Sequence, residues 1–173
     1  MTHRISILTI AVLLSARVGS VEGQSCVLGE DPPDYCDTAR TISGDVGQHV
    51  VYVDASRATS SGEDYCGIPV GHTTWFDVTP TVSGLLTIST CHPNTTFDTV
   101  LRVWSGGDSM CDFMSPLTCV DDTLSAACSI ACGNYGSTAQ LFATAGTRYR
   151  FAVGTYNGNA AGCDLCLGVI VTI

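Results

Sequence analysis

Ten cysteines follow an apolar leader, and none lies within it. The leader, residues 1–23, has a basic residue at Arg4, an apolar run over residues 5–14, and small residues near its end. This order is typical of a cleavable signal peptide, and a run of about ten residues is too short to span a bilayer. We therefore expect a secreted protein without a membrane span, in which the even number of cysteines forms disulfides. The cysteines are Cys26, Cys36, Cys66, Cys91, Cys111, Cys119, Cys128, Cys132, Cys163 and Cys166.

A zinc site is the alternative use of four of these cysteines. Cys128 with Cys132, and Cys163 with Cys166, would together supply the four thiolates of a tetrahedral zinc site. The export signal and the separation of about thirty residues between the two pairs favour disulfides instead. On one extended strand, Cys163 and Cys166 would lie roughly 10 Å apart, too far for a bridge, so we expect each to pair elsewhere, with Cys128 and Cys132 as candidates.

The charge of the chain limits its partners. Seven basic residues, all arginine, oppose sixteen acidic ones, and the net charge is −9 at pH 7. Such a surface disfavours nucleic acid and anionic membranes and favours cations or neutral and basic surfaces. The absence of lysine also removes Schiff-base chemistry.

Apolar and polar residues alternate with period two in short segments bounded by turn residues, and helical periodicity is nearly absent after the leader. We therefore predict eight or nine short strands in an all-β, antiparallel sandwich. Turns at Ser83-Gly84 and Ala145-Gly146, each between two apolar runs, predict hairpins. The predicted strands are 49–53, 73–78, 85–90, 99–104, 139–144, 148–153 and 165–172, with shorter ones near 41–42 and 117–120.

Alternation also assigns the faces of the predicted strands. Leu86 and Ile88 share one face of their strand, opposite Leu85. In the strand 148–153, the aromatic residues Tyr149 and Phe151 are expected to face the core, whereas Arg148 and Arg150 are expected to face solvent.

Six pieces occur in a fixed order along the mature chain. They are Cys36-Asp37-Thr38-Ala39, Trp75-Phe76-Asp77-Val78, the strand 84–91, Phe97-Asp98-Thr99-Val100-Leu101 with Val103-Trp104, Cys111 and Cys119 with Asp121-Asp122, and the segment 145–151. In this order the chain resembles the bacterial pre-peptidase C-terminal domain family of secreted modules. The resemblance implies a jelly-roll domain over residues 36–173, after an N-terminal extension over residues 24–35. It also implies a role in secretion, adhesion or attachment to matrix protein or polysaccharide.

The resemblance brings three carboxylates together at one end of the sandwich. Asp98 precedes one strand, Asp121 and Asp122 follow another, and the two strands run near each other in the family. Calcium takes six to eight oxygen ligands, largely carboxylates and carbonyls, so the three aspartates are candidate ligands of a calcium ion. The alternative is that each aspartate only bonds to the backbone of its own turn.

Position along the chain predicts three cysteine pairs. Cys111 and Cys119 flank a short loop that contains Pro116, which makes them the best single pair. Neighbourhood in the sequence favours Cys26 with Cys36, and Cys66 with Cys91.

No catalytic constellation is recognisable. Gly107-Asp108-Ser109 is similar to the serine motif of one esterase family, but in that family the serine follows a parallel strand at the start of a helix. The histidines after the leader are scattered, and no nucleophile-elbow or zinc-protease motif occurs. We therefore predict a protein that is not an enzyme.

Contact with a partner is expected at a loop. The aromatic residues of the strands are expected to belong to the core, whereas Tyr156, Asn157 and Asn159 follow a strand and are predicted to bind. Asn94 begins a glycosylation sequon.

Two functions follow from these observations. The first is a secreted module that binds extracellular protein or polysaccharide, with calcium as its candidate cofactor. The alternative is a subunit that self-associates into an extracellular surface layer or fibre through an exposed strand edge.

Overall fold

The computed structural model describes residues 32–59, 64–107, 111–123, 128, 135–158 and 165–173. The predicted signal peptide, Cys26, Cys132, Cys163, Ser109 and Asn159 lie outside these ranges. The described residues form ten strands and two short 3-10 helices. The strands are β1 (Arg40–Ile42), β2 (Gln48–Asp54), β3 (Asp64–Tyr65), β4 (Ile68–Val78), β5 (Gly84–Ser89), β6 (Thr99–Gly106), β7 (Met114–Val120), β8 (Thr138–Ala143), β9 (Tyr149–Tyr156) and β10 (Cys166–Thr172); the helices are η1 (Cys36–Thr38) and η2 (Ala55–Arg57). None of the helices in the described ranges has the length and apolar character to cross a membrane.

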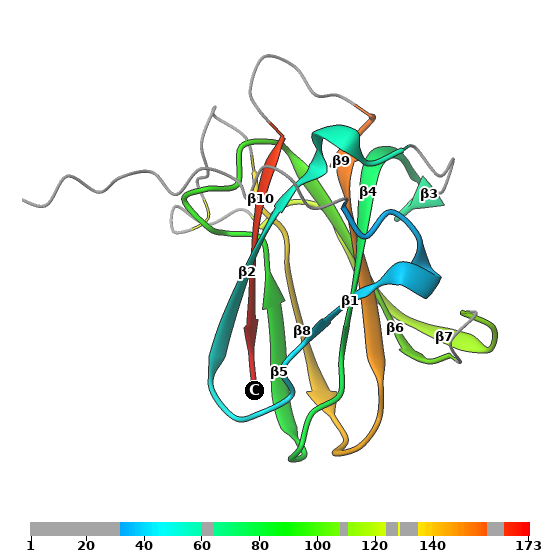
Figure 1. Cartoon of the computed structure of the whole chain (residues 1–173), viewed down its shortest axis with the longest axis vertical. Helices are drawn as coiled ribbons and strands as arrows, with labels where there is room; N and C mark the ends of the chain where they lie inside the picture. Colours follow the sequence, from blue (N-terminus) through cyan, green and yellow to red (C-terminus); the bar gives the residue numbers. More distant parts are fainter. Residues whose placement is uncertain (1–31, 60–63, 108–110, 124–127, 129–134, 159–164) are drawn as a thin grey trace, which may run out of the picture.

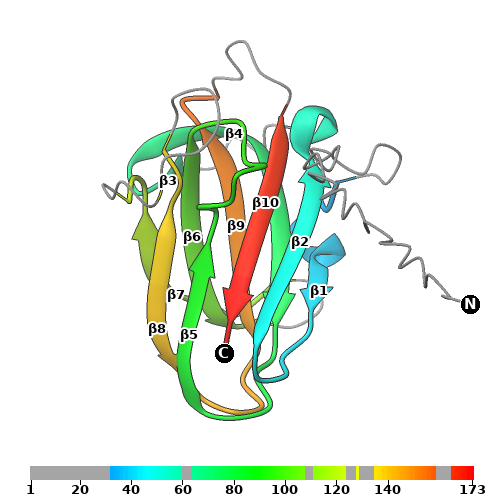
Figure 2. The same ribbon diagram turned by 90° about the vertical axis from the view of Figure 1, so that its left-hand side faces the viewer.

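Two sheets pack face to face (Figures 1 and 2). The larger has the order β1-β4-β9-β6-β7, with β3 paired to β4, and the smaller has the order β2-β10-β5-β8. With β1 and β3 set aside, the eight remaining strands have jelly-roll order, because the chain passes repeatedly from one sheet to the other. The fold class predicted from the alternating segments is therefore confirmed. The parallel pairing of β1 with β4 is the exception to the antiparallel pattern.

The turns at Ser83-Gly84 and Ala145-Gly146 do not close hairpins. The first joins β4 to β5 and the second joins β8 to β9, and each pair of strands lies in different sheets. The two turns instead bond to each other: the N–H of Ala145 donates to Oγ of Ser83 at 2.9 Å, and the N–H of Gly146 donates to the carbonyl of Pro80 at 2.9 Å. The hairpin prediction was wrong because a turn sequence specifies a reversal of the chain but not the sheet it enters.

The main core lies between the sheets. It includes Leu86 and Ile88 of β5 and Phe151 of β9, all 0% exposed. Phe151 stacks on Phe76 of the neighbouring strand β4, with ring centroids 5.1 Å apart. The predicted faces are thus confirmed for these strands, and Leu85 on the opposite face of β5 is 57% exposed.

A second apolar cluster covers the outer face of the larger sheet. Trp75 of β4 and Trp104 of β6 stack there at 5.0 Å, and Tyr65 of β3 meets Trp104 edge-on. The segment before β1 runs over this face, and the N–H of Trp75 donates to the carbonyl of Pro33 at 2.6 Å. The segment before β1 and strand β3 thus form a layer over this face, which we call the covering layer. It explains one wrong prediction: Arg150 points outward from its sheet as expected, yet it is only 2% exposed.

Disulfides join distant segments rather than sequence neighbours. The bonds are Cys36–Cys111, Cys66–Cys119 and Cys91–Cys128, and Cys166 is also disulfide-bonded. The pairs predicted by neighbourhood, Cys111–Cys119, Cys26–Cys36 and Cys66–Cys91, are therefore wrong, and Cys128 does not pair with Cys163 or Cys166. Two of the three bonds attach the covering layer to the β6–β7 hairpin. Cys36 precedes β1 and bonds to Cys111 in the β6–β7 connection, and Cys66 follows β3 and bonds to Cys119 in β7.

Candidate metal site

Asp98, Asp121 and Asp122 meet at one end of the sandwich. One carboxylate oxygen from each lies within 4.8 Å of the others. Asp98 comes directly before β6 and the other two directly after β7. Because β6 and β7 are antiparallel, with Leu101 opposite Val120, the start of one strand lies beside the end of the other. The structure therefore brings together the three carboxylates proposed from the sequence.

Buried hydroxyls fix the backbone beneath the carboxylates. Thr90, Thr99 and Ser137 are all 0% exposed, and the hydroxyls of the two threonines are 2.7 Å apart. The hydroxyl of Ser137 lies within hydrogen-bond distance of the carbonyls of Thr99 and Asp121. The backbone of Asp98 is held as well, since its carbonyl accepts the N–H of Tyr156 at 3.0 Å. The acidic residues thus lie on a network that joins the ends of β5, β7 and β9 to the starts of β6 and β8.

The carboxylates disfavour one another's ionised forms. Burial, followed by the negative charges of Asp122 and Asp121, raises the pKa of Asp98 to about 6, and a hydrogen bond from the N–H of Thr99 opposes this rise. Burial and the charge of Asp122 also raise the pKa of Asp121. Among the described residues, the buried Oδ1 atoms of Asp98 and Asp121 have no hydrogen-bond partner. A carboxylate oxygen that is buried without a donor is costly, and a bound cation would remove that cost.

The donor set suits a hard cation. All three side chains offer carboxylate oxygens, and the cluster contains neither histidine nor cysteine. Oxygen ligands suit Ca²⁺, Mg²⁺ or Mn²⁺, whereas Zn²⁺ and copper are usually held by imidazole or thiolate.

The loop predicted to bind a partner adjoins this site. Tyr156 ends β9 and is half-buried against the outer apolar cluster, while Asn157 is exposed. Asn157 has a left-handed backbone, with φ of 50°, which asparagine tolerates better than most residues. Asn94 is half-buried, and its backbone N–H donates to Nδ1 of His92 at 3.1 Å. Its glycosylation stays a prediction.

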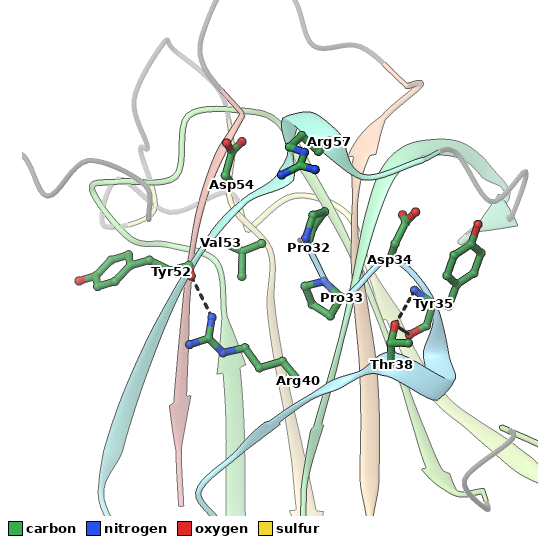
Figure 3. A pocket seen from close by; sticks show the side chains of 10 residues that line it. All are labelled: Pro32, Pro33, Asp34, Tyr35, Thr38, Arg40, Tyr52, Val53, Asp54 and Arg57. Carbon is green, nitrogen blue, oxygen red and sulfur yellow. Dashed lines mark hydrogen bonds between the residues drawn. The ribbon is translucent and has the colours of Figure 1, made fainter. Parts of the chain in front are cut away.

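A pocket of about 590 Å³ was not predicted from the sequence (Figure 3). Its walls come from the segment before β1, from β1 itself, from the end of β2 and from η2. No local motif could have indicated it, because the residues that line it meet only after the two sheets have packed.

Comparison with known proteins finds fold-level likenesses only. No family model and no curated protein matches the sequence. One similar solved structure is the pre-peptidase C-terminal domain of a collagenase from Bacillus anthracis, with 11% identity, coverage of 83% of this chain and 98% of that chain, and a TM-score of 0.38. Another is CorA of Methylomicrobium album BG8, described as a surface-associated copper-binding protein, with 13% identity, coverage of 78% and 98%, and a TM-score of 0.39. The first carries the name of the family that the sequence motifs resemble. At these TM-scores, neither likeness carries an argument about what this chain does.

Proposed function

We propose that this protein is a non-catalytic, extracellular binding module that takes up Ca²⁺ at Asp98, Asp121 and Asp122. The observation that carries the proposal is the pair of buried carboxylate oxygens that lack hydrogen-bond donors among the described residues. In this proposal, calcium fixes the end of the sandwich, and the adjoining loop with Tyr156 and Asn157 contacts a matrix protein or polysaccharide. The disulfides support an oxidising, extracellular location.

Calcium is expected to raise the melting temperature of the mature protein at pH 7.5. A ligand at 100 times its Kd adds about 2.7 kcal/mol to the free energy of unfolding, which corresponds to a rise of several degrees for a chain of this size. Differential scanning calorimetry with calcium, against protein treated with a chelator, measures the shift.

Matched variants locate the effect. Asp98→Asn is expected to remove most of the shift, whereas Asp37→Asn, an exposed aspartate in η1 outside the cluster, is expected to keep it. An equal shift in both variants would place the calcium elsewhere, and no shift in the wild type at millimolar calcium would exclude the site.

The calcium effect is expected to depend on pH. The pKa of Asp98 is about 6 in the folded protein, above its ordinary value of 3.8, so its carboxyl destabilises the metal-free fold as pH rises from about 4 to about 6. Above that range the carboxylate is ionised and can coordinate a cation. The rise in melting temperature caused by calcium should therefore be larger at pH 7.5 than at pH 5. His92 also responds to pH: burial lowers its pKa, so its protonation destabilises the fold at acid pH. The difference in calcium-induced shift between wild type and Asp98→Asn, taken at each pH, separates the effect of Asp98 from that of His92. A calcium shift that is equal at both pH values would contradict a role for Asp98.

Self-association is a second candidate, favoured by the outer face of the smaller sheet. Phe142 of β8 and Leu85 of β5 are register partners there, and they are 76% and 57% exposed. By alternation, this face also carries Gln48 and Val50 of β2, Thr87 and Ser89 of β5, and Thr138 and Gln140 of β8. None of these six side chains is an acid or a base. Two copies of an acidic protein could approach through such a face without repulsion.

A charge placed on this face is expected to prevent association. Light scattering after size-exclusion chromatography, over a range of protein concentrations, should give a larger mass for wild type than for Phe142→Asp. Phe113→Asp is the matched control, because Phe113 is 91% exposed in the β6–β7 connection. A wild type that stays monomeric at all concentrations would rule out this candidate.

A further inference from the structure

The pocket lies where the two sheets separate at one edge of the sandwich (Figure 3). Arg40 comes from β1 of the larger sheet, and Val53 comes from β2 of the smaller one. In this view Pro32 and Pro33, of the segment before β1, lie beside Val53 and between Arg40 at one end and Arg57 of η2 at the other. A volume of about 590 Å³ is in the range of sites that bind small ligands.

Two arginines and two aspartates supply the charged groups of this pocket. The described residues of this acidic chain include five arginines, and Arg40 and Arg57 both line the pocket. Figure 3 shows their guanidinium groups on opposite sides of Val53. Nη1 of Arg40 donates to the carbonyl of Tyr52 at 3.3 Å, which holds that guanidinium at the wall. The planar fork of arginine matches the paired oxygens of carboxylate and sulfate groups.

Two aspartates add acceptors at fixed positions. The carboxylate of Asp34 accepts both the N–H and the hydroxyl of Thr59, each at 2.7 Å. The carboxylate of Asp54 accepts the N–H of Ser56 at 2.9 Å. An ionised carboxylate has room for about four hydrogen bonds, so each can also accept from a ligand hydroxyl. These negative charges would repel a uniformly acidic peptide, but they suit a ligand that combines an anionic group with hydroxyl donors.

Apolar groups supply the surface between the charges. The rings of Pro32 and Pro33 and the side chain of Val53 lie toward the centre in Figure 3. The ring of Tyr52 points away from the pocket and meets His92 edge-on at 5.1 Å, so Tyr52 contributes its carbonyl rather than its ring. A sugar ring has this same combination of C–H faces and hydroxyl edges.

We propose that the pocket binds a short anionic oligosaccharide, with one carboxylate or sulfate group at Arg40, a second at Arg57, and hydroxyls at Asp34 and Asp54. This inference goes beyond the proposed function, because it names a ligand class and uses a site that shares no residue with the calcium cluster.

Isothermal titration of the mature protein with matched ligand pairs tests the proposal. An oligogalacturonide is compared with its fully methyl-esterified form, which keeps the rings and removes the charge. A sulfated dextran oligosaccharide is compared with the unsulfated parent. Binding of a charged member and not of its neutral partner supports the proposal, and the pair that responds tells carboxylate from sulfate. Absence of binding to both charged ligands, or equal binding within each pair, would overturn it.

Variants then place the ligand in the pocket. Arg40→Gln and Arg57→Gln should each weaken binding about tenfold, since each removes a charge-assisted contact. Arg148→Gln removes the same charge from an exposed arginine that does not line the pocket, and it should leave the affinity unchanged. Arg57→Lys, which retains the charge, should fall between wild type and Arg57→Gln, and the melting temperature of each variant reports whether it folds. Equal losses in the pocket variants and in Arg148→Gln would contradict the assignment.

The calcium site serves as an independent control. Asp98→Asn should lose the calcium-induced thermal shift but bind the saccharide normally. Failure of either site can therefore be told from failure of the other.

Discussion

Removal of the Cys36–Cys111 disulfide, by replacement of both cysteines with alanine, is expected to lower the free energy of unfolding by about 4 kcal/mol. The bond closes a loop with a sequence separation of 75, the longest among the described disulfides, and a cross-link of this span restricts the unfolded chain most. The native state loses contacts as well, because Cys36 packs against the outer apolar cluster. Nη1 of the buried Arg150 lies 3.5 Å from Sγ of Cys36. The loss should therefore reach at least the value expected from chain entropy.

Urea unfolding without reductant measures this loss. The double variant Cys66→Ala/Cys119→Ala is the matched control, since it removes a disulfide with a shorter separation of 53 from the same covering layer. We expect a loss slightly smaller than that of the first variant. Near-ultraviolet circular dichroism should also change in both, because Trp75 and Trp104 lie beneath this layer. An unfolding midpoint equal to that of wild type would show that the Cys36–Cys111 bond does not stabilise the fold.

Replacement of Phe151 with alanine is expected to lower the free energy of unfolding by about 3–5 kcal/mol. Phe151 is 0% exposed in the centre of the larger sheet, and it stacks on Phe76, which is also 0% exposed. The sandwich cannot close around the missing ring without moving both sheets, so a cavity should remain.

The chain offers a matched control for this prediction in Phe142. The same substitution there, at a residue 76% exposed, should change stability by less than about 0.5 kcal/mol. Thermal and urea unfolding of the two variants, at a protein concentration where both are monomeric, gives the comparison. Similar losses in both would mean that the sheets do not pack as described.

The strands could be predicted because burial on one face leaves a period of two in the sequence. Leu86 and Ile88 alternate with polar or exposed neighbours, and Phe151 alternates with Arg150 in the same way. That pattern says which residues share a face of a sheet, but not what covers the other face. Arg150 is therefore on the predicted face and yet buried, because the segment that carries Cys36 packs over it.

The acidic site could be predicted because its geometry is local to one hairpin. Asp98 and Asp121 flank strands that pair directly, so their approach follows from the pairing of β6 with β7. The pocket between β1 and β2 has no such basis, because Arg40 and Arg57 belong to segments that meet only when the two sheets pack together. The cysteine pairs failed for a related reason, since Cys111 and Cys119 lie in one hairpin but bond to segments far earlier in the chain.

No cysteine of the three described disulfides bonds within its own hairpin, and the shortest sequence separation is 37. Each native bond can therefore form only when two segments far apart in the sequence have come together. A refolding time course quenched by alkylation would then record when these segments meet, because each newly protected thiol shows that its partner segment has reached it.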